Sequence, residues 1–129
     1  MNTSKIRTAV ATAAIAATVL TPAVANANDG DTLRNGSCSI GADWKLKLSP
    51  ENRRIEVEYQ VDANRRGQRW RVALFHDGRR VMRTVRTTHG LSGSFTVRDR
   101  QANRRGVDRI RARAVRLGDG QTCVGRARF

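Results

Sequence analysis

The sequence predicts an all-β fold, an antiparallel seven-stranded sandwich of the immunoglobulin-like or fibronectin-like type with one disulfide. Apolar and polar residues alternate in short runs, which is the period of half-buried strands, and no stretch has helical periodicity. Turn residues separate these runs at spacings of about ten residues, as in a sandwich. A small β-barrel fits the same pattern and is the alternative.

Each predicted strand has a buried face made by alternate residues. The third strand places Trp70, Val72 and Leu74 on one face, and Asp77-Gly78 predicts a hairpin turn after it. The fourth strand is irregular, because Met82 points away from its apolar neighbours, and we expect a bulge or a sheet edge there. The seven strands are expected at 44–48, 55–61, 69–75, 80–87, 95–97, 110–114 and 123–129.

Residues 1–27 have the pattern of a secretory signal peptide. Lys5 and Arg7 precede an uncharged, Ala-rich run over residues 8–20, and Ala25-Asn26-Ala27 offers small residues at a cleavage site. This run is shorter than the roughly 20 residues that a transmembrane helix needs. We therefore expect a secreted, extracellular protein without a transmembrane segment.

The remaining chain divides into two parts. Residues 28–37 are polar and contain glycine, which predicts a flexible N-terminal arm, and residues 38–129 form the predicted sandwich domain. Cys38 and Cys123 are the only cysteines, and in an exported protein an even number indicates a disulfide, with free thiols or an intermolecular pair as the alternative. No other feature indicates assembly, so we expect a monomer.

Several segments of this domain form a distinctive set: Ile55–Val61, the Asn-Arg-x-Gly loop, Gln68–Val72, Ser92–Val97 and the flanking cysteines. Together they resemble functionally uncharacterised small exported proteins of high-GC Gram-positive bacteria. The resemblance covers nearly all of the chain beyond the signal peptide. It implies no known activity and supplies no site residues.

One loop sequence occurs twice, 39 residues apart. Ala63-Asn64-Arg65-Arg66-Gly67 recurs at residues 102–106, each time before a strand that begins Arg-apolar-Arg. In a seven-stranded sandwich the two copies lie at opposite ends, so they cannot form one site. We interpret them as turns in which Asn and Gly supply the backbone angles.

Charge is the strongest functional signal, with a formal net charge of +14 and Arg predominating. In the expected strand order the third, sixth and seventh strands are neighbours, so their outward arginines share a face without any acid. The opposite sheet presents Lys45, Lys47, Glu56, Glu58, Thr96 and Arg98, whose charges can offset one another. The candidate anion-binding residues are Arg69, Arg71, Arg109, Arg111, Arg113, Arg126 and Arg128.

This face predicts an exported, non-catalytic binding module for an anionic polymer or a cell-envelope surface, which can retain the protein by charge. Teichoic acid, nucleic acid and anionic lipid headgroups are the candidate partners. The competing interpretation is a solvated face whose arginines reflect a GC-rich genome. The alternative function is a protein-recognition module, such as an inhibitor of an exported enzyme. Its partner would be bound by the polar loop Thr87–Gly93, which we expect to have no packing contacts with the rest of the domain.

Catalytic chemistry has little support in the sequence, and we predict that the protein is not an enzyme. His76 and His89 belong to no nucleophile motif and are expected at the surface. Asp29-Gly30-Asp31 lacks the further acidic ligands of a calcium loop. We therefore expect no catalytic residues, no metal site and no cofactor.

Overall fold

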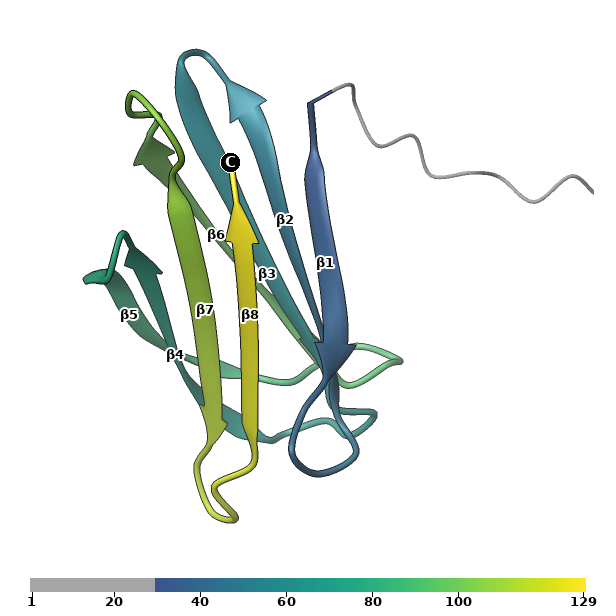
Figure 1. The fold of residues 1–129 in the computed structure, drawn as a ribbon. Helices are drawn as coiled ribbons and strands as arrows, with labels where there is room; N and C mark the ends of the chain where they lie inside the picture. The colour runs from purple at the N-terminus through teal and green to yellow at the C-terminus, as the bar shows by residue number, and fades with distance from the viewer. Residues whose placement is uncertain (1–29) are drawn as a thin grey trace, which may run out of the picture.

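The strands of the computed structural model form two antiparallel four-stranded sheets, which face each other across one core (Figure 1). The structure describes residues 30–129, and the expectations for the signal peptide and for the start of the arm lie outside the described residues. Its strands are β1 (Thr32–Ser37), β2 (Asp43–Glu51), β3 (Arg54–Asp62), β4 (Arg69–His76), β5 (Arg79–Thr87), β6 (Ser94–Ala102), β7 (Arg109–Arg116) and β8 (Thr122–Arg128).

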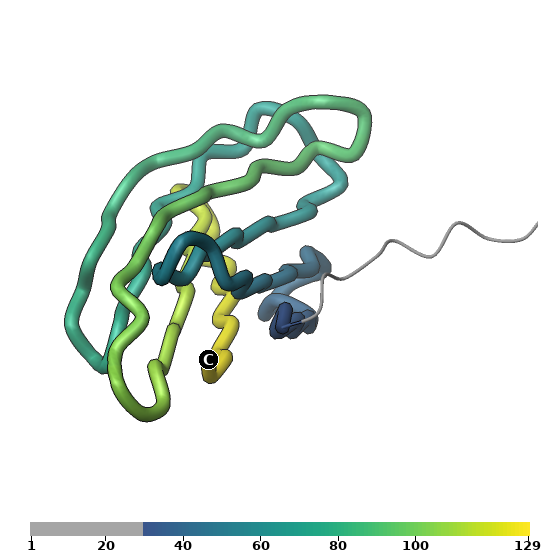
Figure 2. Tube along the Cα trace, turned by 90° about the horizontal axis from the view of Figure 1, so that it is seen from above, coloured from purple at the N-terminus to yellow at the C-terminus, as the bar shows by residue number. Residues whose placement is uncertain are grey.

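The first sheet has the strand order β1-β2-β3-β6 and the second sheet the order β5-β4-β7-β8. The outer strands β1 and β8 lie beside each other along one margin, as Figure 1 and the view from above in Figure 2 both show. The predicted two-layered all-β architecture is confirmed, and the alternative of a closed barrel is wrong because no strand of one sheet is paired with a strand of the other. Within residues 30–129 there is no helix that could cross a membrane.

The structure has eight strands rather than seven, because β1 forms where the sequence predicts a flexible arm. β1 carries one large apolar residue, Leu33, which is 48% exposed, so it has no alternating pattern. It forms instead by backbone pairing with β2, in a register that sets Gly36 opposite Trp44. A Cβ atom on Gly36 would lie 2.8 Å from the Trp44 ring, so only glycine lets the strand approach so closely.

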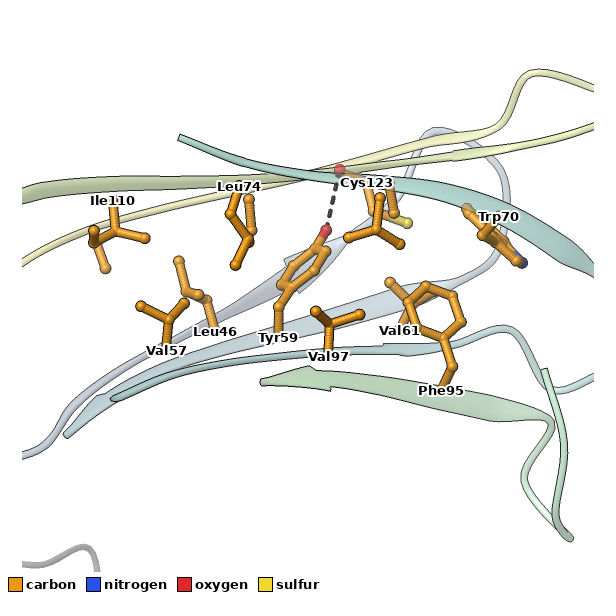
Figure 3. Close-up of a cluster of buried hydrophobic side chains, with 14 of the residues drawn as sticks. Leu46, Val57, Tyr59, Val61, Trp70, Leu74, Phe95, Val97, Ile110 and Cys123 are labelled. Carbon is orange, nitrogen blue, oxygen red and sulfur yellow. Dashed lines mark hydrogen bonds between the residues drawn. The ribbon is translucent and has the colours of Figure 1, made fainter. Parts of the chain in front are cut away.

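The core lies between the sheets and is built from alternate residues of β2, β3, β4, β6, β7 and β8 (Figure 3). Trp70 of the second sheet packs on Phe95 of the first, with ring centroids 6.2 Å apart. The buried Tyr59 of β3 reaches across the core, where its hydroxyl donates a hydrogen bond of 3.1 Å to the carbonyl of Cys123 in β8 (Figure 3). This bond joins the sheets through an otherwise apolar layer.

The predicted disulfide between Cys38 and Cys123 is confirmed. Cys38 lies in the loop between β1 and β2, and Cys123 lies in β8, so the bridge connects the first sheet to the second. The N–H of Ser39 also donates to the carbonyl of Thr122 at 2.9 Å beside it. Residues 85 positions apart are thereby fixed at one end of the sandwich.

The irregularity predicted in the fourth strand is also confirmed. β5 is one of the two outer strands of the second sheet, and its register with β4 shifts between Leu74 and Phe75. Leu74 pairs with Met82 and Phe75 pairs with Arg80, which leaves Val81 as the extra residue of a bulge.

Candidate anion-binding surface

All seven candidate arginines lie on the outer face of the second sheet, on β4, β7 and β8. They alternate along each strand with buried residues such as Trp70, Val72, Ile110 and Ala112, so their side chains point away from the core. We call this surface the arginine face; it contains Arg69, Arg71, Arg109, Arg111, Arg113, Arg126 and Arg128. The structure therefore brings together what the sequence predicted to be together.

β5 adds two further arginines to this face. Arg80 pairs with Phe75 and Arg83 pairs with Ala73, and both of these β4 residues point outward. These two arginines were absent from the predicted face because the bulge at Val81 breaks the simple alternation of β5. The register between β4 and β5 shows that these two arginines point outward, and this register cannot be predicted from the sequence of β5 alone.

Carboxylates are absent from the strands of the second sheet, since β4, β5, β7 and β8 contain no Asp or Glu. None of the seven candidate arginines forms an ion pair within residues 30–129. The nearest acids lie in turns and have other partners: Asp77 pairs with Arg104, and Asp119 pairs with Arg116. Within residues 30–129 no carboxylate on the sheet itself balances the positive charge of this face, and Asp77, in the turn after β4, is the acid whose charge interacts with Arg109.

The first sheet differs, as expected, because its charges pair across strands. Arg98 of β6 lies opposite Glu58 of β3, with Nε and Oε2 3.0 Å apart. Arg100 Nη2 lies 2.7 Å from Glu51 Oε1, and Lys47 Nζ lies 3.2 Å from Asp31 Oδ2. The two outer faces of the sandwich therefore differ strongly in charge.

A groove with a volume of about 500 Å³ lies at one corner of the arginine face. Two pairs of arginines from β7 and β8 line it, and the members of each pair lie directly opposite each other: Arg109 with Arg128, and Arg111 with Arg126. We call these four residues the arginine quartet. Arg34 of β1 also lines the groove, a residue that was not predicted because it falls in the expected arm.

Phe75 is the aromatic residue of this groove. It pairs with Arg111 across β4 and β7, and the guanidinium carbon of Arg111 lies 4.0 Å from the centre of the Phe75 ring. A guanidinium stacked on an aromatic face is attracted by the ring electrons, and its orientation is restrained. The Phe75 side chain therefore holds one member of the quartet in place and is itself covered.

A cluster of polar residues lies at the same end of the sandwich. His76 is buried, and its Nε2 atom lies 2.6 Å from Oδ1 of the equally buried Asp108, which corrects the expectation that His76 lies at the surface. The sequence could not reveal this pair, because the partner is 32 residues away in another loop. His89 lies in the loop before β6, at the other end of the sandwich, so the two histidines do not meet.

Asp77 completes this cluster, in which one nitrogen or oxygen atom from each of the three side chains lies within 4.8 Å of the others. Both carboxylates already have backbone partners, since Asp77 Oδ1 accepts the N–H of Arg109 at 2.9 Å and Asp108 Oδ2 accepts the N–H of Arg104 at 3.0 Å. The N–H of Arg109, together with nearby positive charge, lowers the pKa of Asp77. These contacts fix the start of β7, and with it the position of the quartet.

The repeated loops lie at opposite ends of the sandwich, as expected from the strand order. The first copy is packed against the predicted recognition loop Thr87–Gly93. The hydroxyl of buried Thr88 donates to the carbonyl of Arg65 at 2.5 Å, and a Cβ atom on Gly93 would overlap the backbone of Arg65. The expectation that the recognition loop has no packing contacts is therefore wrong; only its tip is free, where Leu91 is 99% exposed.

Comparison with known proteins finds no relative of this chain. No family model, no curated protein and no solved structure matches it. The function is consequently inferred from the geometry and charge described above.

Proposed function

We propose that the protein is an exported, non-catalytic binding module whose arginine face holds an anionic polymer or an anionic cell-envelope surface. The observation that carries the proposal is a sheet with no carboxylate on any strand and outward arginines on all four. The disulfide is compatible with an oxidising, extracellular compartment, which agrees with the signal peptide expected at residues 1–27. The protein would act as a monomer and be retained by charge.

The strand order supports assigning the fold to the immunoglobulin-like or fibronectin-like type, which is part of this proposal. In immunoglobulin-like and fibronectin-like sandwiches the third, sixth and seventh strands lie side by side, and β4, β7 and β8 have the same arrangement once β1 is set aside as an addition. Such sandwiches commonly serve as binding modules, but fold alone names no ligand.

Crowding of like charge explains why an anion would be held. The Cα atoms of arginines two positions apart on a strand are about 6.7 Å apart, and the Cα atoms of arginines directly opposite on neighbouring strands are about 5 Å apart. Each such pair of like charges costs tenths of a kcal/mol in the free protein. A phosphate or sulfate offsets this repulsion, because each guanidinium can donate two hydrogen bonds to anionic oxygens and the polymer releases counterions.

Salt dependence tests the proposal. Binding of a fluorescent single-stranded DNA or of heparin is titrated over a series of NaCl concentrations, with the wild type and with Arg109, Arg111 and Arg113 replaced by Ser. The slope of log K against log salt falls by roughly 0.7 for each phosphate that the protein no longer neutralises, so the slope of the triple variant with DNA should be smaller by roughly 2.

The matched control is Lys45→Ser, Arg98→Ser and Arg100→Ser on the first sheet, which removes the same charge. Its slope should stay close to that of the wild type, since these side chains face the opposite side of the sandwich. Equal slopes for the two triple variants would show that only net charge matters and would refute a binding face. Absence of binding at low salt would refute the proposal as a whole.

Protein recognition through loops is the second candidate because of Leu91. A fully exposed leucine on a loop whose base is tied to a neighbouring loop is a rigid apolar contact. A partner bound in this way would remain bound at about 0.5 M salt, where charge contacts are screened within a few Å. If Leu91→Ser abolished binding of this partner and the arginine variants still bound it, protein recognition would be favoured over the arginine face.

A further inference from the structure

The groove at the corner of the arginine face concentrates positive charge more than the rest of that face. The quartet has two directly opposed pairs, Arg109 with Arg128 and Arg111 with Arg126, and Arg34 adds a fifth guanidinium from the first sheet. Along β7 and β8 the members of successive pairs are two residues apart, or about 6.7 Å. The quartet therefore consists of two pairs of opposed arginine positions, one behind the other along the strands, with the guanidinium of Arg111 leaning over Phe75 of β4.

Aromatic stacking in this groove is limited to one half-buried ring, on which a guanidinium is already stacked. Phe75 is the one aromatic residue on the outer side of the second sheet, and Arg111 covers its ring at 4.0 Å. Proteins that hold single-stranded nucleic acid through its bases offer free aromatic faces for them. The groove instead offers charge, donors and the aliphatic stems of arginines, so it is suited to anionic groups and not to bases.

The spacing of the two pairs fits a particular repeat of anions. Six bonds separate successive phosphorus atoms when three carbons lie between phosphodiesters, as in a nucleic acid backbone or a glycerol phosphate chain. Bonds of about 1.5 Å allow such a chain to place its phosphates roughly 6 to 7 Å apart when extended. Successive phosphates of this chain can therefore each meet one pair of the quartet.

We infer that the ligand is a phosphodiester chain with three carbons between phosphates, anchored at the arginine quartet through two successive phosphates, with no reading of bases. This inference rests on the proposed function and narrows it to one ligand chemistry and one anchoring site. The remaining arginines of the face attract the chain at longer range and contact it less closely; they are Arg69, Arg71, Arg80, Arg83 and Arg113. Phe75 acts as a positioning residue, since it orients Arg111.

Synthetic phosphodiester chains of equal charge test the chemistry of the ligand. The probes are oligomers of propanediol phosphate, oligodeoxythymidylate, and an oligomer whose phosphates are separated by a nine-carbon spacer, each with the same number of phosphates. The first two should bind with dissociation constants within about threefold of each other. The long-spacer chain should bind about tenfold or more weakly, because its phosphates lie farther apart on average and reach the quartet spacing only when the flexible spacer folds back.

The outcomes separate the inference from the proposed function. Tighter binding of the thymidylate by about tenfold or more would show that bases are bound and would overturn the inference, as would equal binding of the long-spacer chain. In both cases the proposed function would stand, since an anionic chain would still be bound. If none of the chains bound at low salt, the proposed function would fail together with the inference.

Variants of matched charge test the anchoring site. Arg109→Ser with Arg126→Ser should weaken binding of the propanediol phosphate chain about tenfold or more, and Arg69→Ser with Arg71→Ser by about threefold or less. Equal losses would overturn the anchoring role of the quartet. Circular dichroism and the urea midpoint of each variant show whether its fold is retained.

The positioning role of Phe75 is tested without a change of net charge. Arg111→Lys keeps the charge but loses the planar group stacked on the ring, so it should weaken binding several-fold, while Arg69→Lys, away from the groove, should have little effect. Phe75→Leu should produce a loss similar to that of Arg111→Lys, and adding it to Arg111→Lys should produce little further loss. Full additivity of the two substitutions would contradict the positioning role.

Discussion

Removal of the disulfide should destabilise the domain by several kcal/mol. Replacing Cys38 and Cys123 by Ala opens a loop whose ends are 85 positions apart. In the chain-entropy model, closure of a loop of this length lowers the entropy of the unfolded chain enough to stabilise the folded state by about 4.5 kcal/mol at 25 °C. A small domain has a total stability of about 5 to 15 kcal/mol, so the loss would be a large part of it.

Urea unfolding followed by tryptophan fluorescence measures this loss. The oxidised wild type, the reduced wild type and the double Ala variant are compared; the reduced protein retains both sulfur atoms and therefore separates loss of the crosslink from loss of packing around buried Cys123. The reduced wild type and the double Ala variant should both unfold at a much lower urea concentration than the oxidised wild type. Their m-values should be larger, because the open chain exposes more surface on unfolding. A loss below about 1 kcal/mol with an unchanged m-value would refute the view that this bridge acts on the unfolded state.

Three further predictions concern the loop contact, the core hydrogen bond of Tyr59 and the stability at high pH. Gly93→Ala should lower the free energy of unfolding by about 3 kcal/mol or more, because Gly93 has a φ of +62° and the new Cβ would overlap the Arg65 backbone. The control Gly90→Ala, at φ +73° with open space around it, should lower it by only about 1 kcal/mol. Equal urea midpoints for the two variants would contradict this prediction. Tyr59→Phe should cost about 1 to 2 kcal/mol, because it leaves the carbonyl of Cys123 without this donor. Burial raises the pKa of Tyr59 above its ordinary value of 10.0, so the folded state keeps the proton longer, and stability from this group is complete below pH 10 and decreases as the pH rises above it. Since Tyr59 is the only tyrosine, tyrosinate absorbance should appear together with alkaline unfolding, and its appearance in the folded protein at pH 10 would contradict the prediction.

The strands with a buried face could be predicted from the sequence, because alternation records burial directly. Trp70, Val72 and Leu74 illustrate the rule: their spacing of two residues places them in the core and their arginine neighbours outside. The same alternation, combined with the strand order of a known sandwich type, was enough to predict which arginines share a face. The disulfide could be predicted because only two cysteines occur.

The features that were missed depend on partners that are distant in the sequence. β1 has no apolar pattern, since its stability comes from pairing with β2 and from the contact of Gly36 with Trp44. His76 is buried because Asp108 folds against it, and neither residue alone indicates the other. Arg34 joins the groove only because β1 and β8 are neighbours in space.

The contrast between an ion-paired first sheet and an uncompensated second sheet gives the molecule a permanent electric moment directed across its two layers. Near an anionic layer this moment exerts a torque before any contact forms, within a screening distance of about 8 to 10 Å at physiological salt. If the proposed function holds, we expect the molecule to arrive already turned, with its strands parallel to the layer. The long axis then lies flat, and the loops at both ends are left at the sides, open to a second partner.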